Sequence, residues 1–317
     1  MNLLKEIRQG RPRAIAKAIS LVENNGARAQ RLMKGVFACR REALVVGITG
    51  APGTGKSTLV DQMIGYLRAA GKSIGIVAVD PSSPFSGGAI LGDRIRMMRH
   101  SVDEGVFIRS MATRGHLGGL AKATGEAIAI YEAAGKDYVL AETVGVGQDE
   151  VEVVKLADLI LVVVTPGAGD DIQTFKAGIM EIADIFVLNK ADSPGAEKTE
   201  RQLRAMLELS FQDKGPPPLV KTVATKGKGV DALMTEIGRL TGARNRRAQE
   251  ERRKRLLFWM LRDVTREKIF QLISRHVEEI ELKELVDRIY RRETDPYTVA
   301  DELIGRLSLK KKPGKRG

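Results

Sequence analysis

The feature that most constrains the fold is an apolar run followed by a glycine-rich loop, ALVVGITGAPGTGKSTL at residues 43–59. Its first half is rich in β-branched residues, which predicts a strand buried on both faces. Its second half, GAPGTGKS at residues 50–57, matches the pattern G-x-x-x-x-G-K-[ST] at every position. The glycines leave room for backbone N–H groups to surround a phosphate group. The stretch therefore predicts a strand, a phosphate-binding loop and a helix in succession.

Each residue of this loop has an expected role in holding phosphate. We expect Lys56 to reach the β- and γ-phosphate oxygens, and the Ser57 hydroxyl to hold Mg²⁺. Thr58 is expected to open the helix, whose N-terminal dipole favours an anionic phosphate. The predicted phosphate-binding residues are Gly50, Ala51, Pro52, Gly53, Thr54, Gly55, Lys56, Ser57 and Thr58.

Composition limits the class of protein. The 317 residues can build one large core, or one core plus an accessory domain, and 43% apolar with 29% charged residues is typical of soluble proteins. The sequence has no eighteen-residue apolar run that predicts a membrane span, and no signal-peptide pattern at its start. Cys39 is the single cysteine, which excludes an internal disulfide and favours a reducing compartment. We therefore expect a cytoplasmic protein that does not enter a membrane.

The net charge of +12 is concentrated at the two ends. Residues 1–41 hold ten lysines and arginines against Glu6 and Glu23, and residues 310–317, KKKPGKRG, add five positive charges. Surfaces that bind nucleic acid interleave basic with aromatic side chains, but aromatic residues make up only 4% of this chain. We therefore do not expect nucleic-acid binding. The charge fits a solvated helical arm with a disordered tail or, as the alternative, an acidic protein partner.

The patterns divide the chain into four predicted parts. These are an N-terminal helical segment at 1–41, a P-loop nucleotide-binding domain at 42–242, a C-terminal helical arm at 243–309 and a basic disordered tail at 310–317. In the second part, apolar runs alternate with helical patterns, which predicts right-handed crossovers and a mostly parallel α/β sheet with helices on both faces. Strands are expected at 44–49, 73–79, 106–110, 138–142, 159–165, 185–189 and 219–222, and helices at 57–70, 119–134, 196–210 and 230–240.

The C-terminal arm is expected to contain two helices outside the sheet. The first, at 245–273, carries Leu256, Met260 and Val264 along one side. The second, at 295–307, has Pro296 in its first turn. Apolar faces with no sheet to cover predict a dimerisation arm, and packing within the chain is the alternative.

Polar residues follow the predicted strands, at the edge of a parallel sheet where ligands bind. NKAD at residues 189–192 matches the guanine-specificity pattern N-K-x-D. The Asp192 carboxylate can accept from guanine N1–H and its exocyclic amine, and adenine would leave that carboxylate unpaired. Asn189 is expected to bridge base and phosphate loop, and the Lys190 stem to lie along the ring. The backbone amides of Ala224, Thr225 and Lys226, at the next strand end, are expected to meet the guanine O6. The sequence therefore predicts a site for GTP or GDP.

Acidic residues at other strand ends predict a magnesium-dependent switch. Glu142 ends the strand DYVLAE, and with Gly145 it forms E-x-x-G where most GTPases have D-x-x-G. We expect Glu142 to reach Mg²⁺ through water and the Gly145 amide to sense the γ-phosphate. Asp80 and Asp93 stand around a glycine-rich stretch typical of a switch loop. The predicted metal ligands are thus Ser57, Asp80, Asp93 and Glu142, and the predicted catalytic residues are Lys56, Asp80, Asp93 and Glu142. Gln148 and Asp149 are candidates for orienting the attacking water, and His116 for facing the site.

These motifs together resemble those of one family. GITGAPGTGKST, VDPSSPFSGGAILGDRIRM, SMATRGHLGGL, ETVGVGQDE, NKAD and DPYTVADEL are similar to the methylmalonyl-CoA mutase-associated GTPases of MeaB and ArgK type, in the family's order over residues 43–307. The resemblance implies a homodimeric GTPase of the SIMIBI class of P-loop proteins. It also implies a chaperone that assists or protects an adenosylcobalamin-dependent acyl-CoA mutase and gates cofactor loading. The basic tail and much of residues 1–40 fall outside the matched motifs.

Three alternative functions stay open. A metallochaperone GTPase for nickel insertion would need a histidine tract or paired cysteines, and three histidines with one cysteine argue against it. A protein kinase of a transport system, which the older ArgK-type description implies, would transfer the γ-phosphate to a protein hydroxyl. In a non-catalytic scaffold, GTP would only hold the structure together and the basic ends would bind nucleic acid.

Overall fold

A computed structural model gives the structure of the chain. It describes residues 2–308 apart from 25, 40, 81–97, 101, 113–118, 144–155, 168–181, 212–214, 244–245 and 277–278. The chain separates into two compact units, Met1–Leu256 and Leu257–Gly317, and each is described by itself below.

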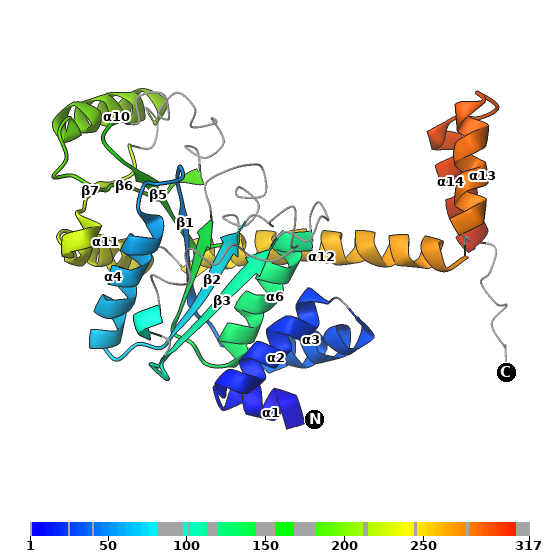
Figure 1. Cartoon of the computed structure of the whole chain (residues 1–317), viewed down its shortest axis with the longest axis horizontal. Coiled ribbons are helices and arrows are strands. Elements are labelled where there is room, and N and C mark those ends of the chain that lie inside the picture. Colours follow the sequence, from blue (N-terminus) through cyan, green and yellow to red (C-terminus); the bar gives the residue numbers. More distant parts are fainter. Residues whose placement is uncertain are drawn as a thin grey trace. The chain divides into compact units, whose positions relative to one another are not determined.

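The first unit is built on a seven-stranded sheet in the order β3-β2-β4-β1-β5-β6-β7 (Figure 1). All its strand pairs within the described residues are parallel, so the carboxyl ends of the strands meet at one edge. The predicted parallel α/β sheet is confirmed, and each strand agrees with its predicted range to within two residues. The strands are β1 (Leu44–Thr49), β2 (Ile74–Asp80), β3 (Val106–Ala112), β4 (Tyr138–Thr143), β5 (Leu159–Val164), β6 (Ile185–Leu188) and β7 (Leu219–Lys221).

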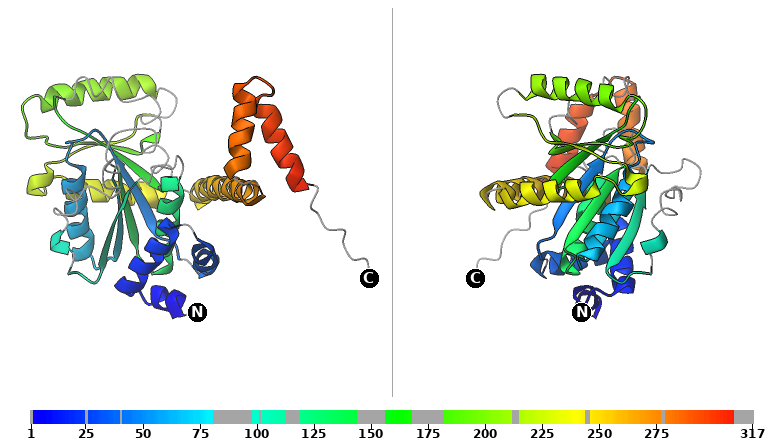
Figure 2. Two further views of the ribbon diagram at one scale, coloured as in Figure 1. Left: turned by 45° about the vertical axis from the view of Figure 1, so that its right-hand side comes forward. Right: turned by 90° about the vertical axis from the view of Figure 1, so that its left-hand side faces the viewer.

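Helices cover both faces of the sheet (Figures 1 and 2). The helices α4 (Lys56–Ala69) and α11 (Val230–Ala243) pack on one face, and α6 (Gly119–Ala133) and α10 (Ala196–Ser210) on the other. Successive residues of β5 enter opposite cores: Leu161 belongs to the core with α4, and Val162 to the core with α6. Because both faces are buried, the strands are apolar without alternation, which is what made them recognisable in the sequence.

Three N-terminal helices lie against α6 as an additional layer (Figure 1). They are α1 (Asn2–Arg8), α2 (Pro12–Glu23) and α3 (Ala27–Cys39), which agrees with the predicted helical segment. The apolar face of α2, including Ile15 and Ile19, is fully buried. Arg109 of β3 donates to the Ser20 hydroxyl at 3.1 Å and pairs with the Glu23 carboxylate, which fastens α2 to the edge strand. The layer therefore belongs to the same compact unit as the sheet.

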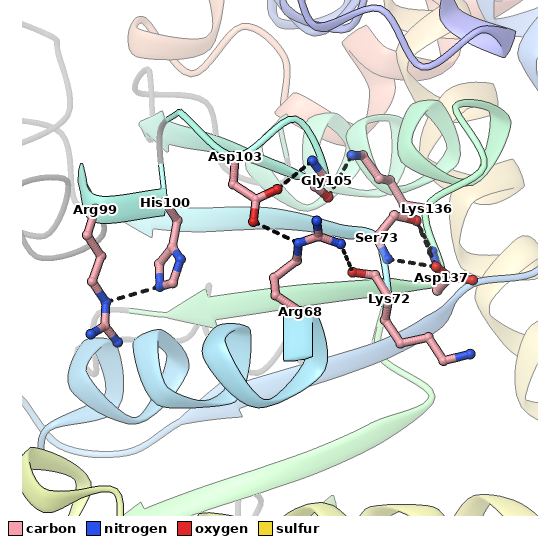
Figure 3. A network of polar contacts seen from close by, with 9 residues as sticks. All are labelled: Arg68, Lys72, Ser73, Arg99, His100, Asp103, Gly105, Lys136 and Asp137. Carbon is pink, nitrogen blue, oxygen red and sulfur yellow. Dashed lines mark hydrogen bonds and ion pairs between the residues drawn. The ribbon is translucent and has the colours of Figure 1, made fainter. Parts of the chain in front are cut away.

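A polar network joins the beginnings of β2, β3 and β4, at the edge opposite the carboxyl ends (Figure 3). Arg68 of α4 pairs with Asp103 at 2.8 Å, and the hydrogen bond from Arg68 lowers the pKa of the Asp103 carboxyl. The Lys136 ammonium donates to the Gly105 carbonyl at 3.0 Å, and burial lowers the pKa of Lys136. Asp137 accepts from the Ser73 amide at 2.7 Å. These contacts align the three strand starts.

The second unit contains the C-terminal part of α12 (Arg246–His276), followed by α13 (Glu279–Tyr290) and α14 (Pro296–Ser308). The expectation of two helices in the arm was wrong, because α13 was not predicted. The pair α13 and α14 buries Leu285 and Val299, and Arg288 lies 3.8 Å from Glu302 across the pair.

The start of α14 is capped by the side chain of Asp295. The Asp295 carboxylate accepts hydrogen bonds from the backbone amides of Tyr297 at 2.8 Å and Thr298 at 3.0 Å. The helix begins at the next residue, Pro296. Within the described residues, no helix combines the length and apolarity needed to span a bilayer.

Substitution by alanine is expected to have opposite effects on stability at two glycines of the first unit. A Cβ added at Gly75 of β2 would lie 2.6 Å from the Tyr131 ring, whereas one at Gly65 of α4 meets nothing within 4 Å. We expect Gly75→Ala to lower the free energy of unfolding by about 1–3 kcal/mol through overpacking. Gly65→Ala should raise it by about 0.5–1 kcal/mol, because alanine is the better helix former. Urea unfolding followed by circular dichroism measures both, and equal shifts of the same sign would contradict this account of the packing.

Candidate functional site

The loop between β1 and α4 has a backbone that glycine alone fits at two points. Gly50 and Gly55 have φ angles of 145° and 87°. A Cβ would lie 2.2 Å from the Val163 carbonyl oxygen at Gly50 and 2.5 Å from Asn189 Nδ2 at Gly55. The glycines of the motif are therefore required by close approach as well as by conformation. The helix begins at Lys56, two residues before the predicted Thr58.

Lys56 lies across the loop that is expected to hold phosphate. Its Nζ donates to the carbonyl oxygens of Gly50 at 2.8 Å and Ala51 at 3.0 Å, and the residue is only 6% exposed. Thr54 closes the same turn by donating its hydroxyl to Ala51 at 2.8 Å. Phosphate oxygens can replace the two carbonyls as acceptors, because the ammonium bonds more strongly to a negatively charged oxygen than to a neutral carbonyl.

Ser57 and Glu142 meet beside this loop. The Ser57 hydroxyl donates to Glu142 Oε1 at 2.6 Å, and both side chains are buried. Glu142 is brought there by sheet register, since it pairs with Ile48 of β1 and with Ala78 of β2. A hydroxyl and a carboxylate are hard oxygen donors, which Mg²⁺ prefers, and the ion commonly takes only one or two protein ligands beside phosphate. The residues present fit the expected magnesium ion.

The remaining acidic residues are placed only in part. Asp80 is the last residue of β2, which runs beside β4, so its backbone lies at the same sheet edge as Glu142. Asp93 and Gly145 lie outside the described residues, as do Gln148, Asp149 and His116. The structure thus brings together Ser57 and Glu142 among the predicted metal ligands.

Asn189 connects the phosphate loop to the opposite half of the sheet edge. It follows β6 and is 2% exposed. Its Nδ2 donates to the Thr54 carbonyl at 2.8 Å, and its Oδ1 accepts from the Thr222 hydroxyl and from the Ala224 amide, both at 3.1 Å. One amide group therefore holds three loops in a fixed relation. Thr222 was missed by the sequence analysis, although its position directly after β7 follows the strand-end rule that located Asn189.

Lys190 has a left-handed backbone with φ 55°, which is uncommon for a residue other than glycine. Its Nζ donates to the Gly53 carbonyl at 2.8 Å, so its stem extends over the gap between the NKAD segment and the phosphate loop. That this stem lies along a bound ring stays a prediction.

Asp192 is exposed and pairs with Lys226. The Lys226 Nζ lies 2.7 Å from Asp192 Oδ2, and this hydrogen bond lowers the pKa of the carboxyl below its ordinary value of 3.8. The carboxylate therefore stays ionised at neutral pH, as an acceptor for two base N–H groups must. Lys226 thus contributes through its side chain, which the sequence analysis did not foresee.

Residues Ala224–Lys226 form the short 3-10 helix η2 after β7. The Ala224 amide donates to Asn189, and the Lys226 amide donates to the Val223 carbonyl at 2.9 Å. Two of the three amides expected to meet guanine O6 therefore already donate hydrogen bonds within the protein in this structure. Thr225, between them, is exposed.

Comparisons with known proteins agree with this geometry. A family model described as "Methylmalonyl Co-A mutase-associated GTPase MeaB" matches residues 15–278. A Pyrococcus abyssi protein named as a GTPase is 47% identical over 309 residues, covering 96% of this chain and 95% of that protein. GTPase ArgK of Escherichia coli is 36% identical over 272 residues, 79% of this chain and 82% of that one. The crystal structure of an LAO/AO transport system kinase shares the fold, with a TM-score of 0.67, 24% identity and 97% coverage of both chains.

The hydrogen bonds of Asn189 should be needed for nucleotide binding and for stability. We expect Asn189→Ala to weaken binding of a fluorescent GDP analogue by about 100-fold or more, and to lower the free energy of unfolding by about 2–4 kcal/mol, because three buried partners lose their bonds. Thr222→Val removes one of these bonds and should cost about 1 kcal/mol with a small loss of affinity. Fluorescence titration and urea unfolding measure both effects. Wild-type affinity in Asn189→Ala would refute the assigned role.

The Asp192 carboxylate should decide which base binds. In Asp192→Asn, the amide offers one acceptor and one donor, which matches xanthine and not guanine. We expect GTP affinity to fall by about 100-fold or more and xanthosine triphosphate to become the preferred nucleotide. The control Asp231→Asn makes the same charge change on the exposed surface of α11 and should leave both affinities unchanged. Unaltered GTP preference in Asp192→Asn would place base recognition elsewhere.

Proposed function

This chain belongs to the MeaB family of methylmalonyl Co-A mutase-associated GTPases, and on that premise we propose that it is a GTP-hydrolysing chaperone. Its client is an adenosylcobalamin-dependent acyl-CoA mutase, which it protects and whose cofactor loading it gates. It works as a homodimer in the cytoplasm, where its single cysteine stays reduced.

The observation that carries the proposal is the hydrogen bond between Ser57 and Glu142 at 2.6 Å. It links the phosphate loop to the end of β4, one residue before the strand ends at Thr143. Loss of the γ-phosphate beside Ser57 would therefore change the surroundings of Glu142 at the end of β4. A chaperone needs such a link, because nucleotide state must alter affinity for the client if hydrolysis is to be useful.

Residues of the chain supply most of the groups for hydrolysis. The loop amides and the Lys56 ammonium bind the phosphates and neutralise the negative charge that develops on the leaving group. Ser57 and Glu142 would hold magnesium, which supplies further charge neutralisation when it is bound. Asn189 fixes the phosphate loop against the base-binding segment, so the base and the γ-phosphate are oriented together.

The kinase alternative differs only in the acceptor of the γ-phosphate. The transport system kinase is 24% identical to this chain, so the similarity concerns the fold alone. Relatives of higher identity are named as GTPases. The proposed hydrolysis needs water in the position where a kinase would need a substrate hydroxyl.

GTP turnover should respond to the client. We expect the purified protein to hydrolyse GTP slowly and to be stimulated several-fold when a methylmalonyl-CoA mutase is added. The Glu142→Gln variant should bind GDP normally and lose about 100-fold in turnover, because the charge on the partner of Ser57 is removed, and Glu142→Asp should recover part of it. Phosphate release and nucleotide titration provide the measurements. Turnover that ignores the mutase argues against the chaperone function, and transfer of γ-phosphate to a protein supports the kinase.

The proposed dimer interface lies on the second unit. Four large apolar side chains, Phe258, Leu261, Ile269 and Leu272, are between 46% and 65% exposed on α12. Their spacing of three, eight and three residues places them on one side of the helix. This stripe is distinct from the predicted Leu256, Met260 and Val264, of which Met260 is only 9% exposed. A second copy of the chain can cover the stripe by the same surface on both partners, as a two-fold interface requires.

A charge introduced into this apolar stripe should dissociate the proposed dimer. We expect Leu261→Lys to convert a dimer into a monomer in sedimentation-velocity experiments, because a desolvated ammonium is costly in an apolar interface. Arg262→Lys, at the neighbouring exposed position, should leave the dimer intact. Nucleotide affinity should not change in either variant. A Leu261→Lys protein that remains dimeric would place the interface on another surface.

A further inference from the structure

The N-terminal helices present a concentrated positive surface. Every lysine and arginine described in α1–α3 and the turns between them is exposed, and none forms an ion pair with a carboxylate among the described residues. The same segment has two acids, Glu6 and Glu23, and Glu23 is already paired with Arg109. These cations, which we call the basic layer, are Lys5, Arg8, Arg11, Arg13, Lys17, Arg28, Arg31 and Lys34.

The helices that carry the basic layer are packed firmly against the rest of the first unit. The inward faces of its helices contribute Ile7, Ile15, Ile19 and Val36 to the core shared with α6, and all four are fully buried. The pair between Arg109 and Glu23 adds a polar anchor to β3. The cations therefore project from a fixed platform, and ordering that platform costs nothing at the moment of binding.

Two of these charges do not favour the helices that carry them, whereas Lys5 and Arg8 lie in the last turn of α1, where the helix dipole favours a cation. The first turns of α1, α2 and α3 contain no acidic residue, whereas Arg13 and Arg28 lie in the first turns of α2 and α3. The positive end of the helix dipole repels a cation at this position. Helix stability therefore does not explain the cations at the starts of α2 and α3.

We infer that the basic layer is a docking surface for an acidic face of a partner protein. Five of its eight cations are arginines, whose planar guanidinium binds carboxylates through two parallel hydrogen bonds. The inference concerns a surface separate from the nucleotide-binding loops, and it holds whether or not the partner is the mutase.

Two other anionic partners fit the basic layer less well. Binding of single-stranded nucleic acid relies on exposed aromatic side chains, and the sole aromatic residue of α1–α3, Phe37, is packed against the core. Peripheral membrane helices insert an apolar face into the bilayer, but here the apolar faces are occupied by the core with α6. Carboxylates on a folded protein require neither feature.

A charge reversal with a matched control tests the inference. In the full chain, Arg28→Glu with Arg31→Glu reverses two cations three residues apart on α3. Lys198→Glu with Arg201→Glu makes the same change, at the same spacing, on the exposed side of α10. Glutamate at position 28 suits the helix dipole, so the first variant should fold with an unchanged or higher melting temperature. An unaltered affinity for a GDP analogue verifies the nucleotide site in both.

Fluorescent poly-L-glutamate is the probe, with poly(U) RNA and phosphatidylserine vesicles as the competing anions. We expect the α3 variant to bind poly-L-glutamate about tenfold more weakly at low salt than the wild type, with a shallower salt dependence, and the α10 variant to bind within about twofold of the wild type. Equal losses in both variants would reduce the effect to net charge and overturn the inference. So would RNA or vesicles that bind more tightly than poly-L-glutamate and lose binding in the α3 variant.

Discussion

Asn189 lies almost fully buried after β6, and its side-chain amide reaches Thr54, Thr222 and Ala224. Asn189 is 135 positions from Thr54 and 35 positions from Ala224 in the sequence. These residues meet because their strands end at the same edge of the sheet. Asparagine provides a donor and an acceptor in one planar group of fixed length. Aspartate would lack the donor for the Thr54 carbonyl, and glutamine would reach too far. The Asn189 side chain therefore couples the phosphate loop to the segments that follow β6 and β7.

The sheet could be predicted from the sequence because its strands are buried on both faces. Short apolar runs rich in β-branched residues, such as 159–164, favour a strand over a buried helix, and the strand-end rule then located Glu142 and Asn189. The order of the strands could not be predicted, since a run of valines carries no information about its neighbour. The pairing of Lys226 with Asp192 was equally hidden, because both side chains are exposed and leave no periodic pattern.

The C-terminal helices show a different limit of prediction. The helix α12 has apolar side chains on more than one side, so periodicity identified a stripe at Met260, while the exposed side chains include Phe258 and Leu261. Which side of such a helix is covered depends on its surroundings and not on its own sequence. The helix α13, EIELKELVDRIY, was missed although its apolar residues recur at helical spacing, because it is short and follows α12 after two residues.

The left-handed backbone at Lys190 lowers the stability of the fold, whereas its side chain has a predicted role in binding the base. A glycine at this position would adopt φ 55° without the steric cost that a lysine pays, and the folded protein would gain from the exchange. The glycine would have no ammonium to reach the Gly53 carbonyl and no stem for the predicted contact with a base. Selection for thermal stability alone would therefore drive this residue toward glycine. At this lysine, the predicted contact with a base would offset a small backbone strain.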